Sequence, residues 1–201
     1  MKLRRKRIEM MLSRLEYRAG SAMLEQYPTP PAVAADILFH AYKRGDIVNK
    51  SVVEFCCGCA PFAIGAAMLG AAEVHGYDVD PGMIECAAEN ARKTDVTVEF
   101  HVMDVLECRE HFDVCFQNPP FGSQYSMRNM DVRILRKAIE CADVVYTLHN
   151  AKTMPYLDAL IAEMGVKLDV KKTYKFEIRH MYEFHRKERV WVEVVMYRLE
   201  V

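Results

Sequence analysis

Residues 51–69 read SVVEFCCGCAPFAIGAAML, and this stretch decides the fold class. The apolar run at residues 51–57 predicts a buried strand, and residues 61–69 predict a helix with Pro61 in its first turn. The small residues between them allow a sharp turn and let the backbone approach a ligand closely. A buried strand that passes through a tight turn into a helix is typical of α/β proteins.

Strands and helices continue to alternate on both sides of this stretch. Further strands are predicted over residues 73–79, 96–103, 112–117 and 144–148, and further helices over residues 3–18, 32–43, 81–92, 132–141 and 156–164. Two last strands, 168–178 and 190–199, follow each other without a helix and therefore form an antiparallel hairpin. We expect an α/β fold with a mostly parallel seven-stranded sheet and helices on both faces.

Length, charge and cysteine content limit the class of protein. The chain has 201 residues and a net charge of −1, so it suits one domain and carries no overall field toward nucleic acid or membranes. Its 7 cysteines are an odd, scattered set, which favours a reducing compartment over a secreted disulfide scaffold. No signal peptide follows the basic start, and the uncharged run at residues 55–72 contains proline and glycines. We therefore expect a soluble protein without membrane contact.

The ends of the first three strands predict a nucleoside site without phosphates. A G-x-G-x-x-G phosphate fingerprint is missing from the first turn. Asp78, at the end of the second strand, is placed to accept hydrogen bonds from ribose hydroxyls, and Asp104 to accept from an adenine amine. These features together fit S-adenosylmethionine.

Each of these residues has a simpler structural interpretation. Asp80, before Pro81, has the position of a helix N-cap. The cysteines Cys56, Cys57 and Cys59 resemble part of a zinc site, but a second ligand pair at suitable spacing is missing. No metal is expected.

The fourth strand ends in the most specific short motif of the chain, Asn118-Pro119-Pro120-Phe121-Gly122. Two prolines fix the backbone and remove two donors, so carbonyl groups face outward. The Asn118 side-chain oxygen and the Pro119 carbonyl are then able to accept both hydrogens of one planar NH2 group. This arrangement favours a pyramidal nitrogen whose lone pair points at a methyl donor. Phe121 offers a face on which the target base stacks.

This motif resembles the [DNS]-P-P-[FYW] motif of class I methyltransferases that modify planar NH2 groups. More closely, the chain is similar to the methyltransferase-like protein 5 family, ribosomal RNA adenine N6-methyltransferases of eukaryotes and archaea. The likeness extends over most of the chain, including Leu24-Glu25-Gln26-Tyr27-Pro28-Thr29, Ala66-Ala67-Met68-Leu69-Gly70-Ala71, Asp78-Val79-Asp80, Phe184-His185-Arg186-Lys187 and Val192-Glu193-Val194. It implies a Rossmann-like class I methyltransferase fold in a single domain, residues 1–201, with residues 1–45 as a helical extension and 46–201 as the core.

The resemblance also implies the residues of the site. The catalytic group would be Asn118, Pro119, Pro120 and Phe121. The residues that bind S-adenosylmethionine, which leaves as S-adenosylhomocysteine, would be Gln26, Tyr27, Thr29, Glu54, Cys56, Gly58, Cys59, Asp78, Val79, Asp104, Val105 and Asn118. One departure stands out, because the family usually has glycine where this chain has Cys56 and Ala60. A Cβ at Cys56 is expected to crowd the methionine part of the cofactor.

The resemblance further implies the substrate and a partner. The substrate would be an adenosine in small-subunit (18S-type) ribosomal RNA. The basic residues expected to contact its phosphates, or else to form solvated surface, are Arg4, Arg5, Lys6, Arg7, His185, Arg186 and Lys187. The partner would be a small zinc-binding activator protein paired along a sheet edge, for which residues 96–103 are a plausible strand. The expected location is the nucleus, nucleolus and cytoplasm in a eukaryote, or the cytoplasm in an archaeon.

Two other functions remain open at this point. A protein glutamine methyltransferase acting on translation release factors shares the fold and the chemistry, but typically carries tyrosine where Phe121 stands. A non-catalytic assembly factor that has lost its cofactor is supported mainly by Cys56. The sequence does not identify the target adenosine.

Overall fold

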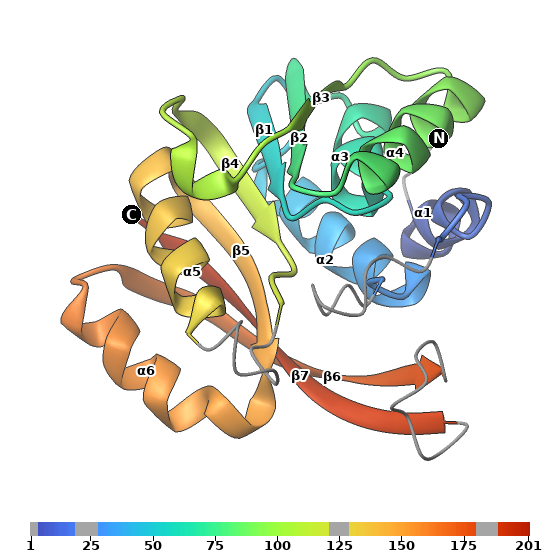
Figure 1. Cartoon of the computed structure of the whole chain (residues 1–201). Coiled ribbons are helices and arrows are strands. Elements are labelled where there is room, and N and C mark those ends of the chain that lie inside the picture. Colours follow the sequence, from blue (N-terminus) through green and yellow to red (C-terminus); the bar gives the residue numbers. More distant parts are fainter. Residues whose placement is uncertain (1–3, 19–27, 121–128, 180–188) are drawn as a thin grey trace.

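A seven-stranded sheet in the order β3-β2-β1-β4-β5-β7-β6 forms the centre of the molecule (Figure 1). The computed structural model describes residues 4–18, 28–120, 129–179 and 189–201. The strands are β1 (Ser51–Phe55), β2 (Glu73–Asp78), β3 (Glu99–Val102), β4 (Phe112–Gln117), β5 (Ala142–Asn150), β6 (Lys167–Arg179) and β7 (Arg189–Glu200). The first five are parallel, and β7 runs antiparallel to both β5 and β6. The predicted fold class is confirmed.

Six α-helices accompany the sheet within the described part of the chain. They are α1 (Arg5–Leu12), α2 (Pro31–Arg44), α3 (Pro61–Met68), α4 (Pro81–Thr94), α5 (Met130–Cys141) and α6 (Met154–Glu163), with short 3₁₀ turns η2 (Val105–Glu107) and η4 (Ala151–Thr153). Proline stands in the first turn of α2, α3, α4 and α6, where its missing N–H costs no helical hydrogen bond. Among these helices, none combines the length and the apolar character that a membrane span needs.

The helices cover both faces of the sheet because each inner strand is apolar on both sides. Val52 packs with residues of α1 to α4, whereas its neighbour Val53 packs with residues of α5 and α6. Both valines are fully buried. Burying a side chain of this size stabilises the fold by roughly 1.5–3 kcal/mol. The two layers are visible on either side of the sheet in Figure 1.

Two predicted elements are shorter in the structure than the pattern indicates. The predicted helix at residues 3–18 ends at Leu12, because tertiary bonds occupy the backbone that follows. The Glu16 N–H donates to the Asn90 Oδ1 atom (2.8 Å), and the Glu16 carbonyl accepts from Asn90 Nδ2 (2.8 Å). The strand predicted over residues 96–103 pairs with β2 only from Glu99 to Val102 and forms the edge of the sheet.

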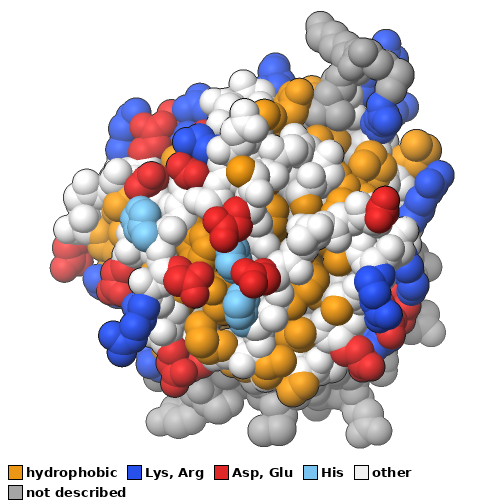
Figure 2. All heavy atoms as spheres, turned by 90° about the horizontal axis from the view of Figure 1, so that it is seen from above, with side chains coloured by type: hydrophobic (Ala, Val, Ile, Leu, Met, Phe, Trp, Pro, Cys, Tyr) orange, Lys and Arg blue, Asp and Glu red, His pale blue; other side chains and the backbone are white. Residues whose placement is uncertain are grey.

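The two ends of the sheet differ in shape. β7 pairs with β5 as far as Val194, and from there to Arg189 it pairs with β6 alone. The hairpin therefore projects beyond the carboxyl ends of the parallel strands (Figure 1). Figure 2 looks from above at the other end, where the parallel strands begin and where histidine and acidic side chains lie together.

Candidate active site

A cavity of about 260 Å³ lies beyond the ends of β1, β2 and β4, close to the lower end of the range for small-molecule sites. All the predicted cofactor-binding residues that the structure describes line it. They are Thr29, Glu54, Cys56, Gly58, Cys59, Asp78, Val79, Asp104, Val105 and Asn118. Gln26 and Tyr27 lie outside the described residues. Lining residues that the sequence did not indicate come from the N-terminal segment (Tyr17, Arg18) and from α5 (Met130, Ile134).

In the turn between β1 and α3, every second residue has a left-handed backbone conformation. Cys56, Gly58 and Ala60 have φ values of 54°, 52° and 60°. A residue with a Cβ costs roughly 1–2 kcal/mol in this conformation, which explains why glycine is favoured at these positions. A Cβ added at Gly58 would meet nothing within 4 Å, so the backbone there borders open space in which a ligand fits.

Glu54 at the end of β1 fixes the start of α3. Its Oε2 atom accepts from the Ala63 N–H at 2.7 Å, and the Phe62 N–H also donates to it. Burial raises the pKa of this carboxyl to about 8, against the opposing effect of these backbone donors. Glu54 therefore positions the turn that borders the cavity, and its direct contact with a cofactor stays a prediction.

Asp78 joins the end of β2 to the same turn. It accepts from the Gly58 N–H at 2.8 Å and from the Asp80 N–H at 3.0 Å. Burial raises the pKa of Asp78 even though these backbone donors act in the other direction. Asp80 itself is the N-cap of α4, accepting from the Gly82 N–H at 2.9 Å, so its structural interpretation is confirmed.

Asp104 lies on the neighbouring wall of the cavity. Its Oδ1 atom accepts from the Leu106 N–H at 3.0 Å and caps the turn η2. The side chain is exposed and lines the cavity next to Val105. The carboxylate is thus held in place at the position from which contact with an adenine amine is predicted.

The catalytic motif reaches the cavity through Asn118 and Pro120. The Asn118 Nδ2 atom donates to the Thr29 hydroxyl at 3.1 Å, and Thr29 is buried. This bond orients the amide, so that the donor end faces Thr29 and Oδ1 is the acceptor end. Pro119 is described but is not among the lining residues, and Phe121 lies outside the described residues.

A buried polar chain, which the sequence did not indicate, lies directly behind the motif. Gln117 Nε2 donates to the Thr147 hydroxyl (2.9 Å), which is 2.8 Å from His149 Nε2. His149 Nδ1 lies 3.3 Å from Asp131 Oδ2. Because the Thr147 oxygen accepts from Gln117, its proton goes to Nε2, and Nδ1–H then faces Asp131. The chain links the end of β4 to the first turn of α5, the two attachments of the segment that carries the motif.

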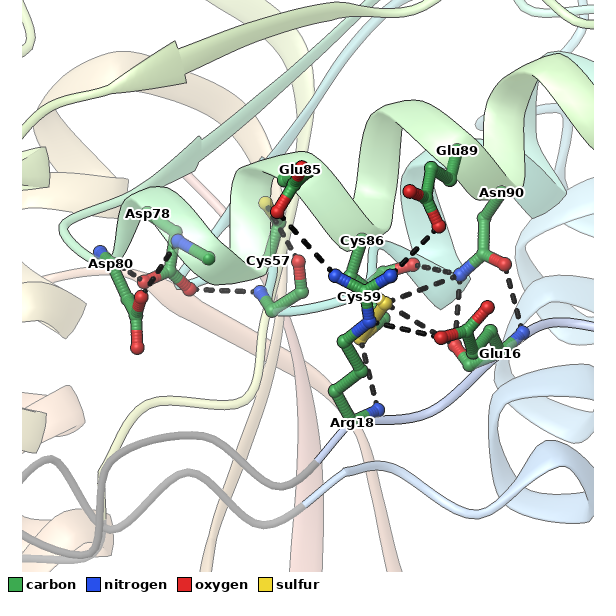
Figure 3. The surroundings of a disulfide bond; sticks show 12 residues. Glu16, Arg18, Cys57, Cys59, Asp78, Asp80, Glu85, Cys86, Glu89 and Asn90 are labelled. Atoms are coloured by element: carbon green, nitrogen blue, oxygen red, sulfur yellow. Dashed lines mark hydrogen bonds and ion pairs between the residues drawn. A yellow bond between two sulfur atoms is a disulfide. The ribbon is translucent and has the colours of Figure 1, made fainter.

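The N-terminal segment forms one wall of the cavity and is anchored to α4 (Figure 3). The Arg18 guanidinium lies 2.9 Å from Glu16, 2.8 Å from Glu89 and 3.6 Å from Glu85. The Arg18 backbone N–H also donates to the Cys59 sulfur at 3.4 Å. Arg18 is thus engaged within the protein.

A disulfide between Cys59 and Cys86 crosses from the β1–α3 turn to α4 (Figure 3). The odd cysteine count did not indicate this pair, which becomes visible only once the fold brings the two residues together. Cys56 and Cys57 are free, and burial raises the pKa of both thiols well above the usual value.

The predicted RNA-contacting residues are only partly described. Arg4, Lys6 and Arg7 are exposed at the start of α1, and Arg5 lies 3.3 Å from Glu9. His185, Arg186 and Lys187 lie outside the described residues. On the projecting hairpin the structure adds an aromatic residue, Trp191, whose surface is 65% exposed.

Comparisons with known proteins find similar sequences and a similar solved structure over nearly the whole chain, and a family model over part of it. Residues 37–119 match the family model described as ribosomal protein L11 methyltransferase (PrmA). An uncharacterised Methanocaldococcus jannaschii protein is 37% identical over 98% of this chain and 94% of its own. The Danio rerio rRNA N(6)-adenosine-methyltransferase METTL5 is 30% identical over 94% of this chain and 95% of its own. A crystal structure from Pyrococcus horikoshii matches with a TM-score of 0.90 at 33% identity, covering 100% of this chain and 98% of that one.

Proposed function

The chain belongs to the METTL5 family of rRNA N6-adenosine methyltransferases, and from this membership we propose that its substrate is an adenosine in small-subunit ribosomal RNA. It is an S-adenosylmethionine-dependent enzyme that methylates the N6 amine. One observation carries the assignment of its site: Asn118, oriented by Thr29, lines the same cavity as Gly58 and Asp78. Residues 1–201 act as one methyltransferase domain, with residues 1–45 as an extension and 46–201 as the core.

The cavity fits a nucleoside cofactor without phosphates. Open space borders Gly58, and the carboxylates of Asp78 and Asp104 supply acceptors for ribose hydroxyls and an adenine amine. S-adenosylmethionine supplies an electrophilic methyl group when bound there. Val79, Val105 and Cys56 provide apolar wall for the rest of the ligand.

Catalysis rests on positioning and electrostatics. The Asn118 Oδ1 atom and the Pro119 carbonyl accept the two hydrogens of the adenine amine, which holds its lone pair toward the methyl donor. The bond from Asn118 Nδ2 to Thr29 fixes the amide orientation before substrate arrives. The buried chain from Gln117 to Asp131 keeps the motif in place from behind. Phe121 gives the target base a stacking surface.

The RNA lies along the carboxyl ends of the strands. Exposed basic residues at the start of α1 contact its phosphates, together with the predicted group His185, Arg186 and Lys187. Trp191 is placed to stack on an unpaired base, a contact worth roughly 1–3 kcal/mol. The enzyme then acts where this RNA is found: nucleus, nucleolus and cytoplasm in a eukaryote, or the cytoplasm in an archaeon.

The edge strand β3 is the docking site for the small zinc-binding activator. β3 lies at one end of the sheet, and β2 is its partner in the strand order. The backbone groups on its outer side are available for strand addition, which gives affinity through main-chain hydrogen bonds.

Two variants test the assignment by their opposite effects. Asn118→Ala should leave S-adenosylmethionine affinity nearly unchanged and lower methyl transfer by roughly 10²–10³-fold, as when a single oriented transition-state group is removed. Asp78→Asn should weaken cofactor binding by roughly 10–100-fold, since a charged acceptor is lost. Calorimetry gives the affinities, and mass spectrometry of digested RNA gives the N6-methyladenosine. Normal turnover by Asn118→Ala would overturn the catalytic role.

A further inference from the structure

The strands β2 and β3 begin with the same short pattern, Glu-x-His. Glu73 and His75 lie on β2, and Glu99 and His101 lie on β3. The parallel register sets His75 opposite Glu99. Since side chains two residues apart on a strand share a face, all four side chains project from the same face of the sheet.

This group is remote from the cofactor cavity. Glu73 and Glu99 are the first residues of their strands, whereas the cavity lies beyond the strands' carboxyl ends. In the view from above, histidine side chains lie flanked by acidic ones in the middle of the exposed face (Figure 2). The methyl transfer reaction therefore does not account for this cluster.

The donor atoms have the spacing of metal ligands. His75 Nδ1 lies 3.2 Å from His101 Nε2 and 3.4 Å from Glu99 Oε2, and these three atoms all lie within 4.8 Å of one another. Zinc bonds to nitrogen and oxygen of about 2.0–2.2 Å place tetrahedral ligands roughly 3.3–3.6 Å apart. The side chains are therefore already close to the geometry that one ion would need.

Hydrogen bonding decides which nitrogen of His75 is available. Its Nε2 atom lies 3.0 Å from Glu73 Oε1, so a proton on Nε2 makes the favourable bond and leaves a lone pair on Nδ1. Without an ion, that lone pair accepts from the His101 Nε2–H at 3.2 Å, and the Glu99 carboxylate lies 3.4 Å from the same nitrogen. A cation at this point would take the place of the His101 proton and be shared by the three donor atoms.

The surrounding side chains hold the two imidazoles in place. The rings of His75 and His101 are nearly parallel, with an interplanar angle of 9°, and Tyr77 stacks on His101 at 4.5 Å between centroids. His75 is buried, and His101 is half-buried. Zinc-class ions prefer a donor set such as the two imidazoles and the Glu99 carboxylate found here. The Glu73 carboxylate lies behind His75, as is usual for a histidine that binds a metal.

We propose that His75, His101 and Glu99 bind a divalent transition-metal ion of the zinc class, with Glu73 orienting His75 and water completing the coordination. The site ties the edge strand β3 to β2 and does not depend on the proposed function. It is also distinct from Cys56 and Cys57, which line the cavity at the other end of the strands.

Metal titration of the untagged full chain, first freed of metal with a chelator, tests the proposal. We expect Zn²⁺ to bind at one equivalent by calorimetry and to raise the melting temperature. Co²⁺ should give the visible absorption of a low-symmetry site. A chain that takes up neither ion would overturn the proposal and leave the cluster as a hydrogen-bonded group.

Conservative variants locate the bound ion. His101→Gln should abolish binding, and Glu99→Gln should weaken it strongly. Glu73→Gln should weaken it by about 10–100-fold, the usual effect of removing a group that orients a ligand. His111→Gln is the matched control, because His111 is an exposed histidine that lies 2.9 Å from Asp143 outside the cluster. Unchanged binding in both His101→Gln and Glu99→Gln, with circular dichroism showing an intact fold, would place the metal elsewhere and refute the site.

Discussion

Buried carboxylates in two regions of this molecule are satisfied in different ways. In the loop between α2 and β1, Asp46 accepts from Arg198 Nε (2.9 Å) and Nη2 (3.1 Å) and from the Tyr146 hydroxyl (2.6 Å). At the cavity, Glu54 and Asp78 accept from backbone N–H groups of the β1–α3 turn and its neighbours. In the first region a carboxylate pairs with a guanidinium, whereas in the second each carboxyl group pairs with backbone N–H dipoles.

The difference separates stability from function. A buried carboxylate beside a guanidinium and the guanidinium itself depend on each other for stabilisation. A buried carboxyl that faces backbone dipoles is desolvated, and the raised pKa values of Glu54 and Asp78 record this. Glu54 and Asp78 can still accept hydrogen bonds from hydroxyl and amine groups of a ligand. Cofactor binding should therefore change the pKa values of carboxyl groups in the cavity.

Among the substitutions that destabilise the protein, breaking the charged pair should cause the largest loss of stability. Asp46→Ala leaves the buried Arg198 with Asp169 and Glu200 as its remaining acidic partners. Removing one partner of a buried pair costs roughly 3–5 kcal/mol, so urea denaturation should show a loss at the lower end of that range. Asp143→Ala, at an exposed ion pair, should change stability by less than about 1 kcal/mol. Cofactor affinity of the folded protein should stay the same, and a large loss would show that the two regions are coupled.

The disulfide should rank second, because it holds the β1–α3 turn of the cavity region to α4. It joins Cys59 to Cys86 across a sequence separation of 27, and the chain-entropy model assigns such a loop about 3–4 kcal/mol. We expect Cys86→Ser to lower the free energy of unfolding by roughly 2–4 kcal/mol. Dithiothreitol should produce the same loss in the wild type and none in the variant. Equal stability of the oxidised wild type and the variant would contradict this role.

The sequence predicted the structural features that depend on residues close together in the chain. Strand and helix order and the cap at Asp80 follow from periodicity and turn chemistry, and the edge position of β3 was expected from the partner that the resemblance implies. Gly58, Asp78 and Asp104 could be placed together because parallel strands end at one edge, whereas Thr29 was named through the family resemblance.

The long-range contacts could not be read from the sequence. Cys59 and Cys86, or Gln117 and Asp131, become neighbours only through the packing of elements that are distant in the chain. The predicted first helix also failed beyond Leu12, because the bond from Asn90 to Glu16 replaces a helical turn. The helix propensity of the residues after Leu12 gives no information about a distant partner such as Asn90.

The pH dependence of the free energy of unfolding should show the effect of pairing the buried Glu54 carboxyl with backbone dipoles. Its pKa is about 8 in the folded protein against an ordinary value of 4.5, so the folded state holds the proton more tightly than the unfolded state. Below pH 4.5 both states are protonated. As pH rises from 4.5 to 8 the free energy of unfolding should fall, by at most about 1.4 kcal/mol per pH unit, and then level off. Urea midpoints measured across this range should show that Glu54→Gln removes this component, and parallel curves would argue against a raised pKa.

The smallest effect concerns the backbone of the cavity turn, where Cys56 takes a left-handed conformation that glycine adopts without strain. Cys56→Gly removes a conformational cost of roughly 1–2 kcal/mol but adds 0.5–1 kcal/mol of chain entropy, so the expected gain is about 1 kcal/mol or less. Because Cys56 also lines the cavity, its removal should raise S-adenosylmethionine affinity. Ala60→Gly is the matched control, since Ala60 has a similar φ of 60° but is buried and is not among the lining residues. If calorimetry shows equal affinity gains in both variants, backbone strain limits binding; a gain confined to Cys56→Gly assigns the limit to its side chain.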